Sequence, residues 1–494
     1  MSSVVKTIYG SVRGENIDGI HVFRGISYGG DTSGKNRFMP PTKPEPWTGV
    51  RDAVNWGHVA PQPPASRNID YTRMTAWMEK PGGEAEDCLV LNVYTPGIND
   101  GGKRPVLFSI HGGGFTSGTS GNPAFNGVPL AKYGDVVVVT INHRLGCLGY
   151  LHLGDLAPEF SSSGVVGMLD CVAALEWVRD NIENFGGDPG NVMIFGQSGG
   201  GAKVCHLMVM PEAKGLFHRA AIQSGASLRS GTRENTNVLT ERMLKQIGIS
   251  KSRVRELQEV PLEMMIGAQM TTGGRFGPFV DGKVIPSHPF DPTAPKISAS
   301  VPLIVGTNLH DFAFITSDFD LDEKGLKAQA KTMFGSAADE VVAAYRASDP
   351  EAAPYLLLAR MTTDRGVRMN SIKLAERKAA LGGAPVYMYL FTWPSVPYGS
   401  KFGSVHGTEV PLFFHNVNAW PITGTGPEAV AMADKLASAY ISFARTGKPS
   451  VPRVSDWPAY TLDSRSTMIL DVDSRVENEP HKELLALVEE KAVE

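Results

Sequence analysis

The chain has 494 residues, of which 42% are hydrophobic and 20% are charged, and its net charge at pH 7 is −4. This length and composition predict a globular protein with a substantial core. The weak net charge gives no electrostatic case for a nucleic acid or an anionic membrane as partner. No apolar run is as long as a bilayer span, so the sequence predicts no membrane association.

The cysteines argue against an oxidising compartment. The chain has four cysteines, at positions 88, 147, 171 and 205. Three of them lie inside apolar segments, which is typical of small buried hydrophobic side chains. Their spacing fits neither a disulfide scaffold nor a metal site. The opening residues, Met1 to Thr7, do not resemble a signal or transit peptide. Together these features predict a cytoplasmic protein.

The first part of the chain predicts hairpins and then loops. Residues 3–28 alternate apolar and polar side chains around glycines, which predicts a small antiparallel sheet. Residues 29–85 are rich in proline and glycine, which predicts a long loop region. Trp47 and Trp56 are interpreted as anchors for these loops. Trp77 is a candidate for the wall of a substrate entrance.

Three strand-like runs follow, at residues 90–94, 105–110 and 136–141, and the last is an unbroken β-branched run of the kind that is buried on both faces. His111-Gly112-Gly113-Gly114 lies directly after the second run. Glycines at a strand end allow backbone N–H groups to approach a ligand closely. No nucleotide-binding pattern is present, so no cofactor is predicted. The segment instead matches an oxyanion hole, and the alternative is a turn without function.

Residues 191–202 predict a short strand, a tight turn and the start of a helix. The turn contains Gly196-Gln197-Ser198-Gly199-Gly200, which fits the G-x-S-x-G nucleophile elbow. A serine hydroxyl is a weak nucleophile and must be held out of the strand to meet a base and a carbonyl carbon. The glycines remove side chains that would collide in such a strained turn. The alternative is a plain strand-to-helix turn that happens to hold a serine.

Alternating strands and helices over residues 100–225 predict a parallel, doubly wound α/β sheet. Two candidate partners of the serine occur later in the chain. Asp311 comes shortly after a short apolar strand, and His406 lies in a loop at 403–409. The remaining periodic segments predict helices at 168–185, 228–270 (packed over the sheet), 322–381 and 427–446, and strands at 218–223, 301–306, 386–391 and 466–471.

Two long segments resemble the carboxylesterase type B family of α/β-hydrolases. Residues 185–200 fit the family's serine signature along their whole length, and Glu86-Asp87-Cys88-Leu89-Val90-Leu91-Asn92-Val93 fits its second signature. Weaker similarities extend the resemblance over roughly residues 4–472. It implies an α/β-hydrolase fold with a mostly parallel sheet, helices on both faces and an extra N-terminal antiparallel hairpin sheet. It also implies one domain over residues 1–494, with inserted helical cap or regulatory segments at about 228–270 and 312–400.

The resemblance implies a catalytic triad of Ser198, Asp311 and His406, in the chain order that α/β-hydrolases require. His406 matches the family's base in Val-His-Gly-Thr-Glu. Asp311 departs from the family, which usually has glutamate there, so the shorter side chain requires a closer loop. His310 and Asp318 are the rival residues.

Further family features carry over to single positions. The implied oxyanion donors are the N–H groups of Gly113, Gly114 and Gly199, the last at a place where the family usually has alanine. The implied structural ion pairs are Arg37 with Glu86 and Arg144 with Asp170. Cys88 stands where secreted members form a disulfide, but the partner position is Ala60, which implies that this bond is absent.

The expected activity is serine carboxylesterase chemistry on small, largely apolar esters through an acyl-enzyme. Four phenylalanines adjoin the catalytic loops and, with Trp77, are candidates for an apolar pocket (Phe115, Phe312, Phe314 and Phe402). Amide, carbamate or thioester hydrolysis would use the same triad. The other alternative is a catalytically inactive adhesion or scaffold member of the superfamily. The expected partner is a small-molecule ester, and the sequence does not distinguish a monomer from a homodimer.

Overall fold

The computed structural model describes residues 3–64, 70–77, 79–315, 318–454 and 456–492. Its centre is a continuous mixed sheet in the strand order β1-β2-β3-β5-β7-β6-β8-β9-β10-β11-β12-β13, with β4 paired to β2. The strands are β1 Ser3–Lys6, β2 Ser11–Ile17, β3 Ile20–Ser27, β4 Val50–Asp52, β5 Val90–Thr95, β6 Arg104–Ile110, β7 Val137–Ile141, β8 Gly187–Gln197, β9 Arg219–Gln223, β10 Leu303–Asn308, β11 Val386–Phe391, β12 Ser466–Leu470 and β13 Arg475–Asn478.

The centre of the sheet is parallel and its two ends are antiparallel. Strands β7, β6, β8, β9, β10, β11 and β12 run in one direction. The N-terminal hairpins join this sheet where β3 pairs antiparallel with β5, and β5 with β7. The predicted mostly parallel sheet and N-terminal hairpins are confirmed, and the hairpins form one edge of the central sheet.

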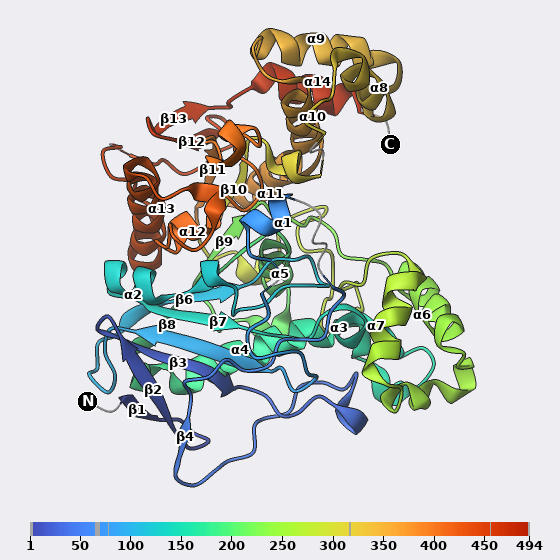
Figure 1. Ribbon diagram of the computed structural model, residues 1–494, viewed down its shortest axis with the longest axis vertical. Helices are drawn as coiled ribbons and strands as arrows, with labels where there is room; N and C mark the ends of the chain where they lie inside the picture. The colour runs from blue at the N-terminus through green and yellow to red at the C-terminus, as the bar shows by residue number, and fades with distance from the viewer. Residues whose placement is uncertain (1–2, 65–69, 78, 316–317, 455, 493–494) are drawn as a thin grey trace.

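Helices cover both faces of the sheet (Figure 1). The helices before β9 are α1 Asp70–Met74, α2 Val128–Gly134, α3 Gly146–Tyr150, α4 Val166–Asn181 and α5 Gly199–Leu207. Those after it are α6 Arg233–Ile247, α7 Leu262–Thr272, α8 Glu323–Phe334, α9 Ala338–Ser348, α10 Pro354–Thr363, α11 Met369–Ala380, α12 Val410–Phe413, α13 Pro427–Thr446 and α14 Lys482–Lys491.

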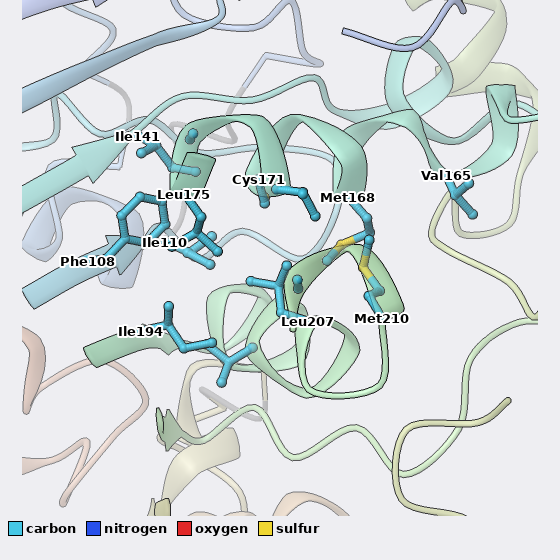
Figure 2. Packing of buried hydrophobic residues seen from close by; sticks show 14 of the residues in the cluster. Phe108, Ile110, Ile141, Val165, Met168, Cys171, Leu175, Ile194, Leu207 and Met210 are labelled. Atoms are coloured by element: carbon cyan, nitrogen blue, oxygen red, sulfur yellow. The ribbon is translucent and has the colours of Figure 1, made fainter. Parts of the chain in front are cut away.

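Alternate residues of the central strands enter two different cores. Along β8, Ile194 belongs to the cluster that includes α4 and α5, whereas Met193 and Phe195 belong to the cluster that includes α2, α12 and α13. Figure 2 shows the first cluster, in which Phe108 and Ile194 from the strands face Leu175 of α4. Burial on both faces explains why these strands are continuous apolar runs in the sequence.

Two predicted helical regions are divided into shorter helices. The region 228–270 breaks at Gly248, which ends α6 in the left-handed conformation (φ 80°), and at Pro261 before α7. These helices lie beside the sheet, where α7 packs against α3 (Figure 1), so the expectation that they pack over the sheet is wrong. The region 322–381 divides into α8, α9, α10 and α11, and the first three share a separate small core with α14.

The C-terminal elements β13 and α14 have no counterpart among the predicted elements. Strand β13 is a short edge strand, Arg-Val-Glu-Asn, whose residues are exposed or partly exposed, so it lacks the apolar alternation that predicts strands. Helix α14 buries Leu484 and Val488 in the small core that it shares with α8, α9 and α10. Among the described residues, no helix has the length and apolar character needed to cross a membrane.

The two expected ion pairs are both present. Arg144 donates to both carboxylate oxygens of Asp170 at 2.9 and 2.6 Å, and Arg37 does the same with Glu86 at 2.7 and 2.6 Å. Cys88 is an unpaired, buried thiol, and the other three cysteines are also free and buried.

Candidate active site

The sheet topology brings the three predicted catalytic residues to one edge. Ser198 follows β8, Asp311 comes shortly after β10, and His406 lies in the segment after β11. Strands β8 to β11 are consecutive and parallel, so the segments that follow them meet at the same edge of the sheet. A Cβ atom placed on Gly407 would lie 4.0 Å from Gln197 Nε2, so the histidine loop adjoins the residue before the serine.

Ser198 occupies a strained turn. Its backbone has φ 57° and ψ −123°, a left-handed conformation that non-glycine residues rarely adopt. A Cβ on Gly196 would lie 2.5 Å from the carbonyl carbon of Gly200, and one on Gly200 would lie 2.1 Å from the Ile110 carbonyl oxygen. Both glycines are therefore required for the close crossing of strand and helix, as the elbow motif predicts.

His406 and Asp311 form a direct hydrogen bond. His406 Nδ1 lies 2.7 Å from Asp311 Oδ1, and the Asn308 backbone N–H donates to the other carboxylate oxygen at 3.0 Å. Asp311 is completely buried. A parallel bridge between His310 and Val405 holds the two loops together, so the shorter aspartate reaches the imidazole.

Among the described residues, neither rival candidate, His310 or Asp318, forms a hydrogen bond with the His406 ring. His310 Nδ1 faces Ser404 Oγ at 3.3 Å, and burial lowers the pKa of His310 to about 4. Asp318 is exposed. The His406 backbone is held from the other side by Tyr71 of α1, whose hydroxyl donates to the His406 carbonyl oxygen at 2.8 Å.

Glu409 is a second buried carboxyl group at the site, and it is not among the site residues predicted from the sequence. Its Oε2 accepts a hydrogen bond from Asn308 Nδ2 at 2.6 Å. Burial, followed by the nearby charge of Asp311, raises the pKa of Glu409 to about 7. Asn308 therefore links the carboxylate that holds His406 to a carboxyl group that titrates near neutral pH.

This raised pKa predicts how stability depends on pH. The folded state binds the Glu409 proton more tightly than the unfolded state, so its contribution to stability is lost as pH rises toward 7. Glu409→Gln mimics the neutral acid, so its stability should not fall in this way. We expect the difference in unfolding free energy between the variant and the parent to increase in favour of the variant by roughly 2–3 kcal/mol from pH 5 to pH 8. Urea denaturation at the two pH values measures this. An equal difference at both pH values would contradict the assignment.

The predicted oxyanion segments are in direct backbone contact. Gly113 and Gly114 have φ angles of 89° and 61°, which favour glycine. A Cβ on Gly199 would lie 2.1 Å from the Gly114 carbonyl oxygen and 2.4 Å from the Gly114 nitrogen. Glycine at position 199 therefore permits an approach that the family's usual alanine would prevent at this distance.

Lys203 of α5 also contacts this loop, and it is not among the site residues predicted from the sequence. Its buried ammonium group donates to the Gly114 carbonyl oxygen at 2.7 Å and lies 5.1 Å from the centre of the Phe115 ring. Burial lowers the pKa of Lys203 to about 7. The signal available in the sequence is a lysine on a short helix of otherwise small and apolar residues, five positions after the nucleophile.

A cavity of about 1120 Å³ opens beside Ser198. Of the five predicted pocket residues, Phe115 and Phe312 line it. Phe314 instead stacks on the His406 ring, with centroids 5.1 Å apart. Trp77 is partly buried against the core that contains α12 and α13.

Phe402 does not belong to the pocket, which corrects the prediction. Its side chain is completely buried and packs edge-on against Phe319 at 4.9 Å. Phe402 is close to His406 in sequence, but its ring packs in the hydrophobic core, as aromatic side chains from loops often do. Within the described ranges, no cluster of three or more histidine, cysteine or acidic residues has the geometry to hold a metal ion.

Comparison with known proteins gives whole-chain matches. The model of the carboxylesterase family matches residues 1–488. The para-nitrobenzyl esterase of Bacillus subtilis is 34% identical over 97% of each chain, and the phenmedipham hydrolase of Pseudarthrobacter oxydans is 32% identical over 94% of each. A carboxylesterase from Geobacillus stearothermophilus superposes with a TM-score of 0.85 at 37% identity, over 98% of this chain and 99% of the other.

Proposed function

The chain belongs to the carboxylesterase family and is a carboxylic ester hydrolase, and on that premise we propose that Ser198, Asp311 and His406 are its catalytic triad. One observation carries the proposal: the 2.7 Å hydrogen bond between His406 and the buried Asp311, at the sheet edge where the strained Ser198 turn lies.

In this mechanism, His406 removes the hydroxyl proton of Ser198 as the serine oxygen attacks the ester carbonyl carbon. Asp311 accepts the Nδ1–H bond, which fixes the tautomer of the imidazole and stabilises its protonated form. The protonated His406 then gives its proton to the departing alcohol. Water repeats the attack on the acyl-enzyme and releases the acid.

The developing oxyanion is stabilised by the backbone N–H groups of Gly113, Gly114 and Gly199. The contact between the Gly114 and Gly199 backbones supports this role, because it brings the two donor segments together. Each preorganised donor of this kind lowers the barrier by about 2.7–4 kcal/mol. Lys203 donates to the Gly114 carbonyl oxygen, so it supports the loop that carries these donors.

The proposed substrates are small esters whose apolar group lies against the apolar wall of the cavity. The wall beside Ser198 includes Phe115, Leu239 and Phe312. The Bacillus relative is named for para-nitrobenzyl esters, which carry an aromatic alcohol. This similarity supports the same class of ester here.

Two further expectations remain proposals. Four buried, unpaired cysteines support a cytoplasmic location, where thiols stay reduced. The segments 228–270 and 312–400 are proposed as insertions into one hydrolase domain. Residues from both segments, such as Leu239 and Phe312, line the cavity beside Ser198, which supports a cap role.

Covalent labelling tests the triad. The purified protein is incubated with p-nitrophenyl butyrate, with and without a fluorophosphonate, and the labelled peptide is identified by mass spectrometry. We expect rapid release of p-nitrophenol that stops when Ser198 alone carries the label. Hydrolysis that survives complete labelling, or a label on a different serine, would overturn the assignment.

A further inference from the structure

The lining of the catalytic cavity includes exposed cationic side chains. Three arginines line it together with Ser198, and they come from three separate segments: Arg229 after β9, Arg242 on α6 and Arg275 after α7. The described residues that line the same cavity include no aspartate and no glutamate. This concentration of one charge contrasts with the slightly negative chain as a whole.

The three arginines differ in the ion pairs that they make with described residues. Arg229 is bonded to Asp291, which also binds Arg377 at 2.8 Å. Arg242 and Arg275 make no ion pair with any described residue. The acid next to Arg242 in sequence, Glu241, is paired with Lys251. Their charges are therefore available to a substrate.

The backbone places both arginines at the cavity in a defined way. Arg242 follows Asn235, Val238 and Leu239 at helical spacing, and all four line the cavity, so one face of α6 forms this wall. A Cβ on Gly274 would lie 2.5 Å from Leu239 Cδ2, and one on Gly277 would lie 3.3 Å from the Phe115 ring. The loop that carries Arg275 thus fills the space between α6 and the aromatic residue beside the oxyanion segment.

Cations that line an apolar cleft attract anions. The low-dielectric walls focus the field of the charges, which raises the local concentration of a substrate of opposite charge. Arginine is also well suited to carboxylates, because its planar group donates two parallel hydrogen bonds.

We propose that Arg242 and Arg275 make this enzyme selective for esters that carry a carboxylate at the end remote from the scissile bond. This inference rests on the proposed function of Ser198. The ester carbonyl lies at Ser198, the intervening chain lies against the apolar wall, and the carboxylate lies between the two arginines. Hydrolysis consumes one water molecule and releases the alcohol and a dicarboxylic acid.

A matched pair of substrates tests the proposal. Monoethyl adipate and ethyl hexanoate share the leaving alcohol and the chain, and they differ in a carboxylate that replaces a terminal methyl group. We expect the double variant Arg242→Ala/Arg275→Ala to lose about tenfold in kcat/KM for monoethyl adipate and less than about twofold for ethyl hexanoate. Raising the salt concentration from about 20 mM to about 500 mM reduces the parent's preference in the same direction.

Arg233→Ala is the control variant. Arg233 lies on the same helix, but it pairs with Asp155 at 2.9 Å and does not line the cavity, so both esters are expected to react as with the parent. An unchanged ratio of the two kcat/KM values in the double variant overturns the inference while ester hydrolysis itself stands. If the parent hydrolyses neither ester and takes no label on Ser198, the proposed function is what fails.

Discussion

Ser198→Ala is expected to reduce ester turnover by about 10⁴-fold or more while the fold is retained. The substitution removes the attacking oxygen, and water in the same cavity then has only the oxyanion donors and substrate binding to assist it. The turn is held by the Ser198 backbone N–H, which donates to the Gln223 carbonyl oxygen at 2.8 Å, so this hydrogen bond does not depend on the side chain. Hydrolysis of p-nitrophenyl butyrate, corrected for the spontaneous rate, measures the loss.

The backbone strain at this position provides an internal control. Alanine retains the unfavourable φ of 57°, whereas glycine adopts it without penalty. Ser198→Gly should therefore be as inactive as Ser198→Ala. Its unfolding free energy should be higher by about 1 kcal/mol, which a higher melting temperature would show. Activity within tenfold of the parent in either variant would remove Ser198 from the mechanism.

Asp311→Asn is expected to lower kcat by about 10³- to 10⁴-fold with little change in KM. An asparagine amide can present its N–H to His406 Nδ1, which favours the tautomer that cannot accept the serine proton. The backbone contact between the two loops, from the His406 N–H to the Asp311 carbonyl oxygen at 3.3 Å, does not depend on the side chain. Steady-state kinetics and a thermal melt separate lost chemistry from lost structure.

Asp311→Glu is the conservative counterpart. It keeps the charge and restores the residue that the family usually has, but it adds a methylene group at a site with no exposed surface. We expect it to retain more activity than the asparagine variant and less than the parent. Because the Asp311 charge contributes to the raised pKa of Glu409, Asp311→Asn should also lower that pKa. Equal activity of the asparagine variant and the parent would assign the supporting acid to another residue.

The framework of the site could be predicted from the sequence because its signals are local. The elbow around Ser198 requires small residues at fixed spacings, and the β-branched run of β7 indicates a strand that is buried on both faces. Asp311 and His406 were placed by resemblance and chain order, and the structure brings their side chains into contact.

The remaining parts of the site depend on contacts between distant segments. Glu409 acquires its raised pKa from burial and from Asp311, about a hundred residues earlier in the chain. The role of Lys203 follows from its hydrogen bond to the Gly114 carbonyl, and Phe402 lies in the core against Phe319. The three arginines belong to separate segments and line one cavity only because the loop after α7 packs against α6. No local sequence pattern indicates these contacts between distant residues.

The order of the strands has a consequence for the protein during its synthesis. The nucleophile leaves the ribosome with β8, roughly two hundred residues before the loop that carries His406. At about 5–20 residues per second, this interval lasts roughly 10–40 s. During that time the serine lacks His406, the base that would activate it. A nascent chain therefore cannot acylate itself on cellular esters, and reactivity toward a covalent probe reports that translation has passed β11.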